Sequence, residues 1–135
     1  MEIKEAKNLD FNLKILQSNK IQALLIPASQ LTKPFKLKKS QLELDIPSVK
    51  SASKNKVSIA IDLNEISQLD KKQKALVLSN LIYLIKICRK TNTNLSFINA
   101  KDKKDVQALL TSLGASSQQT ALSTKPFYLK QYLLL

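Results

Sequence analysis

Acidic side chains are the only groups in this sequence with the spacing to perform catalysis. The chain contains no histidine, one cysteine (Cys88) and one glycine (Gly114). The lack of histidine removes the usual general base and the Ser-His-Asp and Cys-His arrangements. One cysteine is too few for a zinc site, and one glycine is too few for a glycine-rich phosphate loop. The remaining candidates are acidic residues that follow predicted strands: Asp62, Glu65, Asp102 and Asp105.

Two interpretations of these carboxylates are open. Two of them at the carboxyl ends of neighbouring strands form a magnesium site in many parallel α/β proteins. Alternatively, they cap helices or lie solvated in loops, which the sequence favours because so few other ligands accompany them. We therefore expect no catalytic residue, no metal and no cofactor in this chain.

Lysine is the second residue type whose pattern indicates chemistry. The chain has 22 basic and 10 acidic residues, a formal net charge of +12, and Arg89 is its single arginine. Lysine offers a point charge rather than a bidentate fork, so this surface suits phosphate backbones better than base reading. A general lysine decoration of the surface is the alternative. Clustering favours RNA contact by two segments, whose candidate residues are Lys33, Lys36, Lys38 and Lys39 in the first and Lys101, Lys103 and Lys104 in the second.

The stretch from Val57 to Ala100 organises the predicted fold. VSIAIDL alternates apolar and small or polar residues and predicts a strand, and NLSFINA predicts another. Between them, residues 71–90 carry a broad apolar face at helical spacing. A strand, a helix and a strand in this order predict a parallel unit with a right-handed crossover.

The flanking segments extend this pattern. We expect a helix after the cap Asn8, a buried strand in IQALLIP, and a helix whose first turn contains Pro47. After Ala100 we expect a helix that ends at Gly114 and a short helix capped by Ser116 or Ser117. Residues 1–7 are either a strand or a lead-in. The prediction is an α/β fold with three parallel strands, which is either part of a barrel or a small three-layer sheet.

Length and hydropathy complete these expectations. A chain of 135 residues predicts one domain over residues 1–135, too short for a complete eight-stranded barrel of about 250 residues. The longest apolar run, Leu76–Cys88, contains Ser79, Asn80 and Lys86 and is too short to span a bilayer. We expect a cytoplasmic protein with a reduced, buried Cys88. The apolar tail at residues 127–135 should be covered by a partner or a second copy of the chain.

From Ile21 onward, the order of features resembles ribonuclease P protein component 3, the thirty-kilodalton subunit of archaeal and eukaryotic ribonuclease P. The matching pieces are IQALLIP, KPFKLKKS, PSVKSASKNK with VSIAIDL, LSNLIYLIKICRKTN with NLSFINA, and QALLTSLGASSQQTALSTKP. The sequence departs from the family in lacking much of its N-terminal part and in having only KDKKD after NLSFINA.

The resemblance implies a partial, incomplete barrel similar to the TIM and PHP folds. It also implies a subunit without catalytic residues of its own, which assists a catalytic RNA in removing the 5′ leader of precursor tRNA. The implied partners are ribonuclease P RNA, precursor tRNA and a second protein subunit, with no membrane. Two other classes stay open: a small RNA-binding protein of the kink-turn-binding type, and a carboxylate-based, magnesium-dependent phosphoesterase.

Overall fold

The computed structural model describes residues 2–18 and 20–124, and a parallel sheet forms its centre. The strands are β1 (Glu2–Glu5), β2 (Ile21–Ile26), β3 (Ser58–Asp62) and β4 (Leu95–Ile98). They lie in the order β1-β2-β3-β4, and every neighbouring pair is parallel. The prediction of a parallel α/β fold is confirmed, but the predicted number of three strands is wrong because β1 is a fourth.

The extra strand lies at the edge of the sheet. β1 pairs with β2 alone among the described strands, with a register irregularity between Glu2 and Ile3. The Ile3 side chain is 46% exposed, and Lys4 and Glu5 are also exposed. A strand with so little burial carries no clear apolar alternation, which is why residues 1–7 read equally well as a lead-in.

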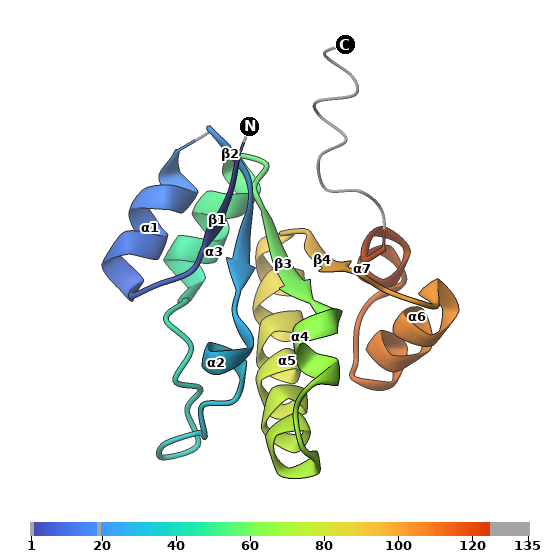
Figure 1. Cartoon of the computed structure of the whole chain (residues 1–135). Helices are drawn as coiled ribbons and strands as arrows, with labels where there is room; N and C mark the ends of the chain where they lie inside the picture. The colour runs from blue at the N-terminus through green and yellow to red at the C-terminus, as the bar shows by residue number, and fades with distance from the viewer. Residues whose placement is uncertain (1, 19, 125–135) are drawn as a thin grey trace.

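Three crossover helices connect successive strands. They are α1 (Leu9–Gln17), α3 (Ile46–Lys54) and α5 (Lys71–Thr91). α1 packs against α3 and α3 against α5, so the three helices line one face of the sheet (Figure 1). Sequential strand order and crossovers of one hand require this arrangement. The described strands form an open sheet with β1 and β4 at its edges, and they do not close into a barrel.

Four shorter helices complete the described chain. α2 (Ala28–Leu31) and α4 (Leu63–Ser67) follow β2 and β3 directly, and neither was expected. α6 (Lys103–Ser112) and α7 (Ser117–Leu122) lie beyond β4, at the right of Figure 1. In α6, Val106 and Leu110 are buried, whereas Leu109 is 37% exposed.

The core lies between the sheet and the crossover helices. Two rows of apolar residues cross the sheet in register, namely Leu24, Ile59 and Leu95, and Ile26, Ile61 and Phe97. They belong to one buried cluster with residues of α3 and α5, among them Val49, Ala52, Leu81, Leu84 and Cys88. Burying each large aliphatic side chain stabilises the fold by about 1.5–3 kcal/mol. This packing holds the ends of the strands, and the loops after them, in fixed positions.

Asn8 and Ser116 cap helices as predicted, by accepting hydrogen bonds from the Phe11 and Gln119 amides. Asp45 caps α3 in the same way by accepting from the Ser48 amide. Gly114 has φ 99°, which is the left-handed conformation expected after a helix. No helix among residues 2–18 and 20–124 has the length and hydropathy to cross a membrane. The apolar tail at residues 127–135 lies outside the described residues.

Burial of Cys88 generates a prediction about alkaline stability. Burial raises the pKa of this thiol from 9.0 to about 12, so the folded state favours the neutral form. The contribution of the neutral Cys88 thiol to the free energy of unfolding is therefore complete below pH 9 and is lost as the pH rises from 9 towards 12. Over that window the free energy of unfolding should fall by about 1.4 kcal/mol per pH unit through this group. Urea unfolding at pH 8, 9 and 10 should show a steeper fall for the wild type than for Cys88→Ala, and equal slopes would contradict the assignment.

Candidate nucleic-acid interface

A lysine-rich hairpin follows α2 and contains the first group of predicted RNA-binding residues. Lys36 and Lys39 exchange two backbone hydrogen bonds of 2.9 Å each, which closes a two-residue turn at Leu37 and Lys38. Both turn residues have positive φ, 52° and 64°, as a type I′ turn requires. Lys36, Lys38 and Lys39 are exposed, and Lys33 is half-buried at the base. We call residues 33–40 the lysine hairpin.

Asn80 of α5 holds both arms of the lysine hairpin. Its side chain is fully buried and donates from Nδ2 to the carbonyl oxygens of Leu31 (2.7 Å) and Lys33 (3.0 Å). Its Oδ1 accepts a hydrogen bond from the Ser40 hydroxyl at 2.9 Å. A buried amide side chain needs hydrogen-bond partners, and the two carbonyl oxygens and the Ser40 hydroxyl supply them here. These bonds hold the base of the hairpin against α5.

The segment that leaves the hairpin is held by the same helix. Tyr83, one turn after Asn80, donates its hydroxyl hydrogen to the Leu44 carbonyl oxygen at 2.8 Å. Burial, and then the Asp45 carboxylate, raises the pKa of Tyr83, so the hydroxyl remains a donor at neutral pH. Leu42 and Leu44 are buried in the core. The exposed tip of the hairpin is therefore joined to a buried, packed base.

The second group of predicted residues begins α6. Lys101, Lys103 and Lys104 are exposed, and Asp102 between them caps the helix by accepting from the Lys104 and Asp105 amides. This helix follows β4, whereas the lysine hairpin follows β2, and β3 lies between those strands. Both groups are at the carboxyl-end rim of the sheet, but Figure 1 shows the hairpin at the lower left and α6 at the right. They therefore form two separate patches and not one continuous face.

The start of α5 adds lysines that the sequence analysis missed. Lys71, Lys72 and Lys74 are exposed in the first turn of this helix, which begins at the same lower end of Figure 1 as the hairpin. Asn80 lies about 9 Å further along the helix axis than Lys74, at a rise of about 1.5 Å per residue. The signal in the sequence was the segment KKQK directly after Asp70, which caps α5. Such a segment is typical of an ordinary solvated helix end and gave no reason to predict an interface.

The carboxylates at this rim bind backbone and side-chain donors. Asp62 accepts from the Asn64 amide at 2.9 Å and from Asn99 Nδ2 at 2.8 Å, and Glu65 accepts from the Ala28 amide at 3.0 Å. Within residues 2–18 and 20–124, no group of three His, Cys, Asp or Glu residues is arranged to hold a metal ion. The capping interpretation therefore describes Asp62, Glu65 and Asp102, while Asp105 is an exposed residue of the first turn of α6.

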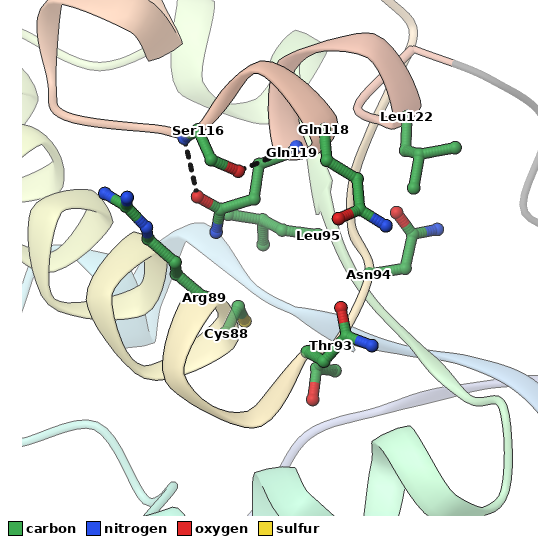
Figure 2. Close-up of a pocket in the computed structure, with 10 residues that line it drawn as sticks. Cys88, Arg89, Thr93, Asn94, Leu95, Ser116, Gln118, Gln119 and Leu122 are labelled. Carbon is green, nitrogen blue, oxygen red and sulfur yellow. Dashed lines mark hydrogen bonds between the residues drawn. The ribbon is translucent and has the colours of Figure 1, made fainter.

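A pocket of about 350 Å³ lies at the opposite edge of the sheet, at the amino end of β4 (Figure 2). Arg89 lies on one side of it, and Asn94, Gln118 and Leu122 lie on the other. Asn94 donates to the hydroxyls of Ser58 and Ser96. Gln119 is held by its capping bonds with Ser116 and by the Ile85 carbonyl. Asn94 and Gln119 thus make hydrogen bonds that stabilise the fold. Among the described residues, those that line the pocket include no aspartate, glutamate or histidine.

These features define a parallel α/β protein whose carboxyl-end rim carries two clusters of exposed lysines. No family model matches the sequence, and no curated protein matches it. The fold is similar to that of a chain in a cryo-EM structure of archaeal ribonuclease P with mature tRNA, with a TM-score of 0.70. The sequences are 18% identical over an alignment that covers 98% of this chain and 58% of the other. The chain thus spans less than two thirds of the protein it matches, and the likeness is one of fold.

The role of Asn80 can be tested by substitution. Asn80→Ala should lower the free energy of unfolding by about 2–4 kcal/mol, because the carbonyl oxygens of Leu31 and Lys33 lose their partner in a buried position. It should also speed trypsin cleavage after Lys36, Lys38 and Lys39 of the hairpin. Ser79→Ala, an exposed change on the same helix, is the matched control. Cleavage at the wild-type rate in Asn80→Ala would contradict the anchoring role.

Proposed function

We propose that this chain is a non-catalytic protein subunit of ribonuclease P, related to protein component 3, that assists the catalytic RNA in removing the 5′ leader of precursor tRNA. The single observation that carries the proposal is the fold match to a chain of an archaeal ribonuclease P structure over 98% of this sequence. The net charge of +12 and the exposed lysines of the rim support it, because the RNA partners are polyanions.

The architecture supports a relation to TIM-like or PHP-like barrels. In such barrels, successive parallel strands are neighbours and the helices form a single outer layer. The order β1-β2-β3-β4, with α1, α3 and α5 in contact on one face, has the same winding. We propose that the chain is one incomplete barrel unit and that a second ribonuclease P subunit or another copy of the chain covers what the sheet leaves open. A cytoplasmic location is part of the proposal.

The two other classes receive less support. Kink-turn-binding proteins have mixed sheets between helical layers, whereas every strand pair described for this chain is parallel. A carboxylate-based hydrolase needs acidic side chains that are free to bind a cation. Asp62 and Glu65 instead accept hydrogen bonds from Asn99 and from the Ala28 backbone.

The experiment that tests the proposed function measures precursor tRNA cleavage by ribonuclease P RNA at limiting magnesium. The full chain, added with a second protein subunit, should raise kcat/KM, and the chain alone should leave precursor tRNA intact. Stimulation that is absent in every combination would contradict the proposal. Cleavage by the chain alone would favour the hydrolase class.

The lysines of the rim should make RNA binding dependent on salt. We predict that Lys101→Ala/Lys103→Ala/Lys104→Ala weakens binding to ribonuclease P RNA and reduces the slope of log K against log salt by about one unit per lost phosphate contact. Lys36→Ala/Lys38→Ala/Lys39→Ala should do the same for the other patch. The measurement is affinity by filter binding at several salt concentrations.

A control with the same change in net charge separates local contacts from general attraction. Lys14, Lys50 and Lys54 are exposed on the outer helices α1 and α3, away from the rim. Their triple alanine variant should bind with a slope close to that of the wild type. An equal loss of slope in the control and in a rim variant would remove that patch from the interface.

A further inference from the structure

The tip of the lysine hairpin carries an apolar side chain in an unfavourable backbone conformation. Leu37 has φ 52° and its side chain is 96% exposed. A type I′ turn favours asparagine and glycine, because other residues incur a steric cost in the left-handed region. Within the fold, Leu37 gains almost no burial to offset this cost. Strain in an exposed turn residue points to a contact outside the chain.

The surroundings of Leu37 are basic. Residues 28–42 contain Lys33, Lys36, Lys38 and Lys39 and no aspartate or glutamate. Lys36 and Lys39 are directly opposite each other in the hairpin, so their side chains project from the same face of the ribbon. Phe35, the residue before Lys36, is 39% exposed. An apolar side chain flanked by positive charges is complementary to an exposed base face flanked by backbone phosphates.

We propose that the lysine hairpin is an RNA wedge: Leu37 inserts between unpaired bases while Lys36, Lys38 and Lys39 contact the flanking phosphates. Apolar side chains act as wedges between base steps in nucleic-acid complexes. Unpaired regions are the preferred target, since the major groove of duplex RNA is too narrow to read and its bases are already stacked. The inference rests on the proposed function and adds to it the structural class of RNA that this patch binds.

Rigidity of the base is what lets such a wedge work. Asn80 fixes both arms of the hairpin through three hydrogen bonds of 2.7–3.0 Å, and Leu42 and Leu44 fix the segment after it in the core. Little conformational entropy is therefore lost when the tip inserts. A flexible loop with the same composition would spend more of its binding free energy on ordering.

The deciding variant is Leu37→Asn, which keeps the turn and removes the apolar group. The probes are a synthetic RNA hairpin with 2-aminopurine in its unpaired loop and a fully paired RNA of equal length. Wild-type protein should bind the loop RNA more tightly and raise its fluorescence as the base unstacks. Leu37→Asn should bind the loop RNA at least about fivefold more weakly, with the same salt slope and unchanged affinity for the paired RNA.

Two further measurements separate the possible failures. Leu37→Asn should raise the melting temperature by about 3–6 °C as the strain is relieved, which excludes unfolding as the cause of weaker binding. Lys38→Gly, which also suits the turn but keeps Leu37, should lower the salt slope by about one unit and retain the fluorescence change. If the wild type binds loop RNA and Leu37→Asn is indistinguishable from it, the wedge is overturned and the proposed function stands.

The remaining outcomes assign the tip to another partner. If the wild type binds neither RNA, both the wedge and the proposed rim interface fail. If Leu37→Asn instead loses binding to phosphatidylserine vesicles or to a polyglutamate peptide, with RNA affinity unchanged, the tip belongs to a membrane or protein contact and the wedge is overturned.

Discussion

Parallel pairing is the constraint on which this structure depends. The connection between two neighbouring parallel strands must run over one face of the sheet, from the end of the first strand to the start of the second. The twist of the strands makes these crossovers right-handed. Because each new strand is added next to the previous one, from β1 to β4, the crossover helices come to lie on a single face. Every segment that leaves a strand then starts from the same edge. The lysine hairpin, the start of α5 and the start of α6 share the rim for this reason, although they are far apart in the sequence.

A second constraint converts that shared edge into a fixed surface. Backbone groups of a buried loop base need partners, and α5 supplies them through Asn80 and Tyr83. The same helix contributes Leu81, Leu84 and Cys88 to the core. The apolar face of α5 thus packs against the sheet, while polar residues beside that face, Asn80 and Tyr83, hold the lysine hairpin and the segment after it. Loss of order in the loop and loss of core stability are coupled through it.

The sequence predicted the elements that are long and strongly periodic, and missed those held by tertiary contacts. Alternation identified β3, and the broad apolar face identified α5 to within a residue at its end. The sequence did not predict β1 as a strand, because an exposed edge strand such as EIKE needs no apolar alternation. The single-turn helices α2 and α4 are too short to show a period. The turn at Leu37 and Lys38 contains neither glycine nor asparagine, so nothing in its composition marks a type I′ geometry.

The sequence proposes which residues form the candidate site but not how those residues are arranged in space. Both clusters of lysines are visible in the sequence, whereas their separation in space follows from β3 lying between β2 and β4, which strand order decides and sequence spacing does not. Shape matters here because lysines attract any phosphate backbone with little preference for sequence. In the proposed interface, selectivity for one RNA would come from the positions of the lysines and from the one apolar group among them. The two lysine patches and the exposed Leu37 at one tip would then set a spacing that an RNA must match, which charge alone does not impose.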